Sequence, residues 1–251
     1  MKQMTLLEHL EELRLRLIWS LAFFGCGIVL AFSQRTFFME VVGYPHRYAM
    51  KKLGLASSLY VFRYQDSFIS QFKVCLMAGF IISFPFIIYH ALKFISAGLF
   101  PEERKKLVFL YLPFFLLLFV SGSLFSYFLL IPYGLHFLAF FGKEVGLTPM
   151  ISFSEYVSFF VILTFITGLV FELPLVMAVL VRIGLLSSLD WRHKRRVAIL
   201  VIFIVSAMIT PTPDPLTQTL LAVPLIFLYE IGCWLSVFIE KGNLKPILPH
   251  P

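Results

Sequence analysis

A single carboxylate, Glu172, lies in a 25-residue apolar run from Val157 to Val181 that holds no other charged side chain. As one helix this run is roughly 37 Å long, enough to cross a hydrocarbon core of about 30 Å. An acid within a bilayer is costly and normally faces a bundle interior or a wet cavity. The alternative is structural, because Pro174 leaves a backbone carbonyl that water or a neighbour must satisfy. We expect Glu172 to be a functional polar group inside a membrane.

A second set of acids precedes the first apolar run. Thr5 and Glu8 fit a capping box, in which a hydroxyl and a carboxylate satisfy opposing backbone donors at a helix start. The helix that follows is amphipathic, and Glu12 lies one turn before Arg16. That pair alone is worth only about 0.3–0.5 kcal/mol, so a solvated charged face is an equally good interpretation.

Further acids follow Pro101 at the start of a later apolar helix. Glu103 lies in its first turn, where the helix dipole favours a carboxylate. If Glu12 and Glu103 lie on the same side of the membrane, each is at the mouth of a span. Carboxylates match the arginine fork in a bidentate way, so such a pair suits guanidinium binding.

The sequence offers no sign of catalysis or of a cofactor. It has no nucleophile elbow, no metalloprotease helix motif and no phosphate-binding loop, and its six histidines have no ligand spacing. The three cysteines lie in apolar stretches without motif spacing, which predicts neither a disulfide nor a metal site. We therefore expect a protein that is not an enzyme and binds no cofactor.

These polar groups must be positioned by membrane helices. Hydrophobic residues make up 59% of the 251 and charged ones 14%, which predicts an integral membrane protein. The net charge of +7 fits basic loops at a membrane and does not require nucleic acid. We predict one membrane domain, residues 1–251, with spans near 15–33, 67–92, 107–131, 157–181, 197–210 and 217–239.

The distribution of basic residues predicts the orientation. With both termini cytoplasmic, fourteen of the 21 Lys and Arg residues lie on the cytoplasmic side. The loop 34–66 is an exception, since it is basic and on the other side, and its length suits an amphipathic surface helix. The last two spans are short and are joined by the proline-rich stretch 211–215, which cannot continue a helix.

Several short motifs occur in the order found in one family. They are His9-Leu10-Glu11-Glu12-Leu13-Arg14-Leu15-Arg16, Ser83-Phe84-Pro85, Glu103-Arg104, Phe171-Glu172-Leu173-Pro174, Thr210-Pro211-Thr212-Pro213-Asp214-Pro215 and Glu230-Ile231-Gly232. Together they resemble TatC, the multispanning receptor of the twin-arginine protein translocase, over roughly residues 5–239. The chain departs from the usual family pattern at His90, Leu92, Lys93 and Ala97.

The resemblance implies an all-α integral membrane protein with six transmembrane helices in a cupped bundle. It implies a multi-pass protein of the bacterial inner membrane that binds the twin-arginine signal peptides of folded cargo. The partners would be TatA-like and TatB-like single-span subunits, with several copies of this chain in the complex.

The resemblance also implies roles for particular residues. Glu12 and Glu103 would receive the arginines, and Arg14, Phe94 and Arg104 would shape that site. Glu172 would lie on the concave intramembrane face. Thr210 and Gln218 would offer polar contacts to a partner's transmembrane helix.

Two other classes of function remain open on the residues alone. An ion-coupled secondary transporter would use Glu172 as its proton carrier, but it gives no role to the acids at the membrane edge. An intramembrane hydrolase would need a nucleophile and a base, and no such pair is apparent.

Overall fold

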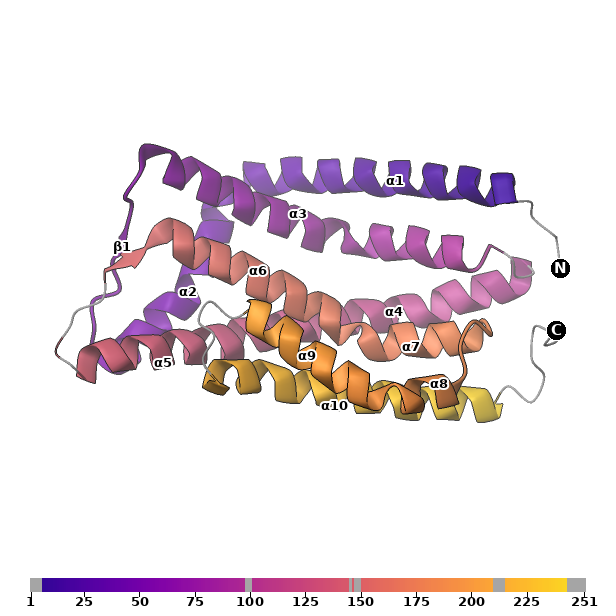
Figure 1. Cartoon of the computed structure of the whole chain (residues 1–251). Helices are drawn as coiled ribbons and strands as arrows, with labels where there is room; N and C mark the ends of the chain where they lie inside the picture. The colour runs from indigo at the N-terminus through magenta and orange to yellow at the C-terminus, as the bar shows by residue number, and fades with distance from the viewer. Residues whose placement is uncertain (1–5, 98–100, 145, 147–149, 210–214, 243–251) are drawn as a thin grey trace.

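A computed structural model describes residues 6–97, 101–144, 146, 150–209 and 215–242, apart from a few side chains, that of Glu103 among them. The described residues are almost entirely helical (Figure 1). The elements are α1 (Leu6–Ser33), α2 (Arg35–Leu53), β1 (Leu59–Tyr60), α3 (Tyr64–Ile95), α4 (Pro101–Phe125), the π-helix η1 (Ser126–Leu130), α5 (Ile131–Glu144), β2 (Ile151–Ser152), α6 (Phe153–Phe171), α7 (Leu173–Arg182), α8 (Ser188–His193), α9 (Arg195–Ile209) and α10 (Pro215–Gly242).

Five helical stretches in the described residues are long and apolar enough to cross a membrane. They are Leu7–Ser33, Tyr64–Ile95, Val108–Glu144, Phe153–Arg182 and Gln218–Lys241. The remaining predicted span corresponds to α9, which has 15 residues. The chain is thus an all-α membrane protein, whereas the sixth crossing and the cytoplasmic placement of the termini stay predictions. The first turn of α1 and the last turn of α10 lie at the same end of the bundle (Figure 1).

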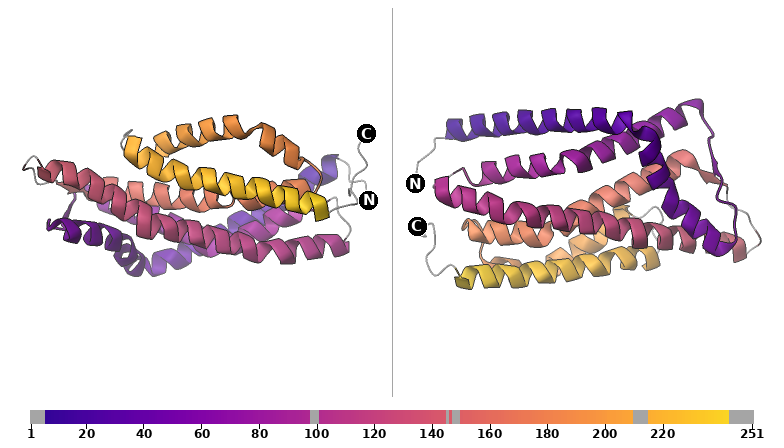
Figure 2. Two further views of the ribbon diagram at one scale, coloured as in Figure 1. Left: turned by 90° about the horizontal axis from the view of Figure 1, so that it is seen from below. Right: turned by 180° about the vertical axis from the view of Figure 1, so that it is seen from behind.

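The long helices run side by side, with α1 at one edge next to α3 (Figures 1 and 2). Their backbones approach closely at two glycines. A Cβ on Gly27 would lie 2.5 Å from the carbonyl oxygen of Gly79, and a Cβ on Gly79 would lie 2.7 Å from the backbone nitrogen of Ile28. Only glycine fits both positions, so this contact fixes where α1 meets α3.

The end of the bundle away from the start of α1 is closed by a cap, which comprises α2 and the paired strands β1 and β2. The two strands are parallel, with Leu59 opposite Ile151. The cap is tied to the bundle because the Tyr156 hydroxyl donates to the Val42 carbonyl and Lys143 Nζ donates to the Leu53 carbonyl. The helix expected in the loop 34–66 is present as α2, and its position at the membrane surface stays a prediction.

The sequence suggested that the apolar run around Glu172 forms one continuous helix. The structure shows instead that the run is divided into two helices. α6 ends at Phe171 and α7 begins at Leu173. Pro174 has no N–H to donate to the preceding turn, so the helix tightens: the Glu172 N–H donates to the Leu169 carbonyl at 3.1 Å. The break places Glu172 at the junction of two helices.

Candidate functional site

The acid predicted from the amphipathic start of α1 lies at the centre of a group of charged side chains. Glu12 Oε1 accepts a hydrogen bond from Arg16 Nη2 at 3.0 Å, and the Glu12 side chain is 14% exposed. The predicted pairing one turn apart is thereby confirmed. Because the pair is partly screened from water, its attraction is stronger than that of a fully solvated pair.

A second guanidinium reaches the same oxygen from another helix. Arg104, near the start of α4, donates from Nη2 to Glu12 Oε1 at 2.6 Å and to the Lys93 carbonyl at 2.7 Å. The carbonyl belongs to the last turn of α3, where helix carbonyls lack partners within the helix. Arg104 therefore joins three helices, α1, α3 and α4, at one end of the bundle.

Aromatic rings lie beside these charges. The rings of His9 and Phe94 stack with centroids 4.5 Å apart and planes inclined by 15°. Lys93 Nζ lies over the ring of Tyr89, 4.3 Å from its centroid. We call the group His9, Glu12, Arg16, Lys93, Phe94 and Arg104 the rim site. It offers a carboxylate and flat ring faces, which is the chemistry that recognises a planar guanidinium.

The structure assembles part of the predicted site. Glu12, Phe94 and Arg104 come together at the rim site, whereas Arg14 is exposed on α1 and takes no part in the contacts above. The backbone of Glu103 precedes Arg104 in α4, but its side chain lies outside the described residues, as do Thr210 and the predicted cap residue Thr5.

Glu172 is buried, with 5% of its surface exposed, which confirms that it does not face lipid. The Phe119 backbone on α4 lies near the carboxyl group of Glu172. Neither carboxylate oxygen makes a hydrogen bond of acceptable distance and angle to any described residue. The Thr167 hydroxyl on α6 is likewise buried and has no hydrogen-bond partner among the described residues. A buried acid without a partner is unfavourable for stability, so Glu172 stays a candidate functional residue.

Gln218, predicted to meet a partner's helix, makes a contact within the chain. Its Nε2 donates to the Phe203 carbonyl at 3.0 Å, which links α10 to α9. The amide oxygen is the part of this side chain that can accept a further hydrogen bond.

Sequence reasoning missed two features at this end of the bundle. It did not anticipate that His9 would cover Phe94, although His9 lies three residues before Glu12 and so on the same helical face. It also missed the ion pair between Arg195 on α9 and Glu230 on α10, whose Nη2 and Oε2 are 2.6 Å apart. The presence of Glu230 within the predicted span 217–239 was the signal in the sequence for that pair.

Known proteins resemble this chain along most of its length. The family described as "Sec-independent protein translocase protein (TatC)" matches residues 8–224. The protein of that name from Carboxydothermus hydrogenoformans is 33% identical over 244 residues, which cover 97% of each chain. Its namesake from Deinococcus radiodurans is 36% identical over 234 residues, covering 92% of this chain and 85% of the relative.

Solved structures agree with this relationship. A crystal structure of the "Twin Arginine Translocase Receptor- TatC" superposes with a TM-score of 0.80 at 33% identity, covering 92% of this chain and 99% of the other. The same receptor crystallised in DDM gives a TM-score of 0.81 at 34% identity. The motif order, the helical fold and these similarities agree: the chain belongs to the TatC family.

Proposed function

We propose that this chain is the receptor subunit of a twin-arginine protein translocase and binds the paired arginines of cargo signal peptides at the rim site. One observation carries the proposal: a half-buried carboxylate, Glu12, holds two guanidinium groups at the end of the membrane bundle. A position that binds the chain's own arginines has the geometry to bind those of a ligand.

The internal contacts suggest how a peptide would enter. Arg16 and Arg104 both bind the same oxygen, Oε1. A carboxylate offers about four acceptor positions, so a peptide guanidinium can add to Glu12 or replace one internal donor. Phe94 and His9 would lie against the flat face of the incoming group. Glu103, adjacent to Arg104 in sequence, would receive the second arginine.

A double perturbation tests the part assigned to Glu103. Glu103→Ala should weaken binding of a twin-arginine peptide by roughly ten- to a hundredfold, the range for a lost charge-assisted hydrogen bond. A peptide with two lysines should bind almost as poorly, because an ammonium lacks the fork geometry. If Glu103 contacts the arginines, the lysine penalty shrinks in Glu103→Ala.

Peptide titration against the purified protein in detergent measures these four combinations. The exposed neighbour Glu102 provides the matched control, since Glu102→Ala removes the same charge from the same turn. Fully additive losses would mean that Glu103 does not touch the arginines and serves only as a first-turn acid of α4.

The partners we propose are TatA-like and TatB-like single-span subunits, which dock at Thr210 and Gln218. An interhelical hydrogen bond in a membrane averages about 0.6 kcal/mol. Gln218→Leu should therefore reduce recovery of a partner subunit while leaving signal-peptide binding intact. Loss of peptide binding in Gln218→Leu would show that the two sites are not separate.

We propose a bacterial inner membrane location with six crossings, both termini cytoplasmic and several copies of this chain in the complex. The rim site would then face the cytoplasm, where cargo arrives. A reporter inserted after Asp214 should behave as extracytoplasmic. A cytoplasmic signal at that position would contradict this topology.

The buried acid favours one other class of function. Glu172 lies inside the bundle without a hydrogen-bond partner among the described residues, as the carrier of an ion-coupled transporter would. If hydrogen bonding is its role in translocation, Glu172→Gln keeps much of the transport and Glu172→Ala loses more. Equal and complete loss in both variants would favour the transporter.

A further inference from the structure

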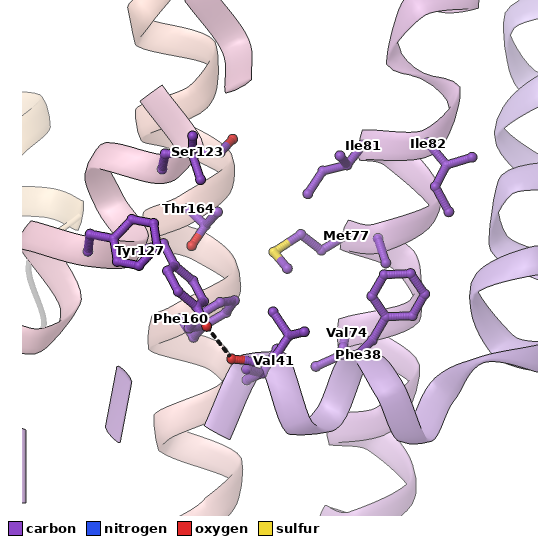
Figure 3. A pocket seen from close by; sticks show the side chains of 14 residues that line it. Phe38, Val41, Val74, Met77, Ile81, Ile82, Ser123, Tyr127, Phe160 and Thr164 are labelled. Carbon is purple, nitrogen blue, oxygen red and sulfur yellow. Dashed lines mark hydrogen bonds between the residues drawn. The ribbon is translucent and has the colours of Figure 1, made fainter. Parts of the chain in front are cut away.

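A cavity of about 380 Å³ lies between the cap and the helices α3, α4, η1 and α6 (Figure 3). Its lining is apolar apart from three hydroxyl groups, those of Ser123, Tyr127 and Thr164. The Tyr127 hydroxyl donates to the Val41 carbonyl at 3.0 Å, as the dashed line in Figure 3 marks. The cavity takes no part in the rim site, which lies at the other end of the bundle.

The cavity opens at the side of the helix bundle. Ile82 on α3, Leu124 on α4 and Phe128 in η1 line it and are themselves 38%, 48% and 56% exposed. These positions belong to stretches that are long and apolar enough to cross a membrane. In a bilayer such an opening meets hydrocarbon, and its apolar walls give water few partners.

Helix α2 covers the end of the cavity nearest the cap, through Phe38, Val41 and Val42. This helix has the composition of a membrane-interface helix, with four basic residues, one acid and exposed tyrosines. The basic residues are Arg35, Arg47, Lys51 and Lys52.

Arg47 lies at the edge of the cavity. Its guanidinium folds back along α2, where Nη2 donates to the Glu40 carbonyl at 3.1 Å, and it lies near Tyr127 of the cavity wall. Arg47 is exposed, so its remaining N–H groups can reach a ligand. Arg35, at the start of α2, lies near Cys75 of α3, and neither residue lines the cavity.

We propose that this cavity holds an acyl chain of a glycerophospholipid whose phosphate is bound by Arg47. The volume falls in the range of about 300–1,000 Å³ typical of small-ligand sites. A guanidinium binds phosphate oxygens in a bidentate way, and an interface helix holds it at headgroup depth. The inference does not depend on the proposed receptor function.

The size of the cavity argues against a peptide helix as its occupant. A helix about 10 Å in diameter has a cross-section of roughly 80 Å², so this volume would admit only about one turn. An extended hydrocarbon chain is narrower than a helix, so the same volume holds a longer stretch of it. The hydroxyl groups of Thr164 and Ser123 have no hydrogen-bond partner among the described residues, so they form a small polar spot in an otherwise apolar lining.

Photolabelling tests the proposal. The protein is placed in vesicles of phosphatidylethanolamine and phosphatidylglycerol that contain phosphatidylglycerol with a diazirine in its acyl chain. After irradiation, labelled residues are located by mass spectrometry. We expect labels on cavity residues such as Met77, Ile81 and Thr164, besides those on the outer surface of α1.

Two variants with matched controls make the test specific. Arg47→Gln should lower cavity labelling by about tenfold, as expected for one charge-assisted contact, whereas Lys51→Gln at the far end of α2 should not. Ile82→Trp should block the mouth, whereas Val29→Trp, on the exposed surface of α1, should not. Both tryptophans replace partly exposed side chains, so the fold tolerates them.

Three results would overturn the proposal. Cavity residues could remain unlabelled while the outer surface of α1 is labelled. Arg47→Gln could leave the cavity labels unchanged. A twin-arginine peptide or a partner subunit could remove the cavity labels, which would assign the cavity to that protein instead.

Discussion

Glu12 and Glu172 are both acids of membrane helices, yet their surroundings are opposite. Glu12 has two guanidinium partners and retains some exposure to solvent. Glu172 is buried and lacks a hydrogen-bond partner among the described residues. The first arrangement stabilises a charge and the second disfavours one. From this comparison we expect cations to bind at the rim site, and we propose that Glu172 acts through its polarity within the bundle.

The largest expected difference between the two acids is in peptide binding. Glu12→Gln should weaken binding of a twin-arginine peptide by roughly ten- to a hundredfold, because an amide cannot hold several guanidinium groups. Glu172→Gln should leave that affinity within about twofold, which is near zero in free energy. Titration in detergent measures both. Glu11→Gln changes an exposed neighbour and serves as the charge control. If Glu11→Gln lowers the peptide affinity equally, the effect of Glu12→Gln comes from the change in net charge alone.

Stability should respond in the opposite direction. Replacing an unpartnered buried polar group by an apolar group of similar size removes a desolvation cost of about 1–3 kcal/mol. Glu172→Leu should therefore raise the unfolding temperature in detergent while transport falls. If Glu172→Leu unfolds at a lower temperature, the carboxyl group has a structural partner and the comparison fails.

The close approach of α4 to α6 keeps Glu172 buried. A Cβ on Gly122 would lie 2.7 Å from Cγ of Phe171 and 2.9 Å from the Thr167 carbonyl oxygen. Gly122→Ala should destabilise the protein by about 2 kcal/mol, within the usual range for overpacking, since Cβ of Phe171 and the Thr167 carbonyl are held by the backbone of α6. Thermal unfolding checks this against Gly25→Ala, which places its Cβ in open space. Equal melting of the two variants would mean that the helices separate easily.

The smallest effect concerns a third carboxylate, Asp190, which caps α8. Hydrogen bonds from the Ser187 backbone N–H and hydroxyl hold the pKa of Asp190 below its ordinary value of 3.8. The cap is therefore fully present above pH 3.8 and is lost as the pH falls below that value. Asp190→Asn should remove this acid sensitivity from hydrogen exchange of the α8 amides. If hydrogen exchange in Asp190→Asn depends on pH as it does in the unchanged protein, another group is responsible for the acid sensitivity.

The parts of the structure that could be predicted depend on local patterns. The Glu12–Arg16 contact follows from helical spacing, and the burial of Glu172 follows from the cost of an acid in lipid. The contact between Arg104 and Glu12 joins residues 92 positions apart, so it depends on how three helices pack. Pro174 marked the break after α6 in the sequence, but the apolar run on both sides concealed it.

The sequence could not indicate the cavity under α2, because its walls come from several separate segments and look like ordinary core. The roles of Glu103 and Thr210 stay predictions, since that side chain and that residue lie outside the described part of the chain.

The glycine contact between α1 and α3 is a point about which α1 could tilt. Gly27 lies fifteen residues after Glu12, or about 22 Å along the helix. A tilt of about 5° around that contact would carry Glu12 sideways by about 2 Å over this length. A movement of that size would lengthen the Arg104–Glu12 hydrogen bond, now 2.6 Å, beyond hydrogen-bond distance if the Arg104 side chain stayed in place. A small rotation of α1 about the contact between Gly27 and Gly79 would thus move Glu12 toward or away from Arg104 at the rim site.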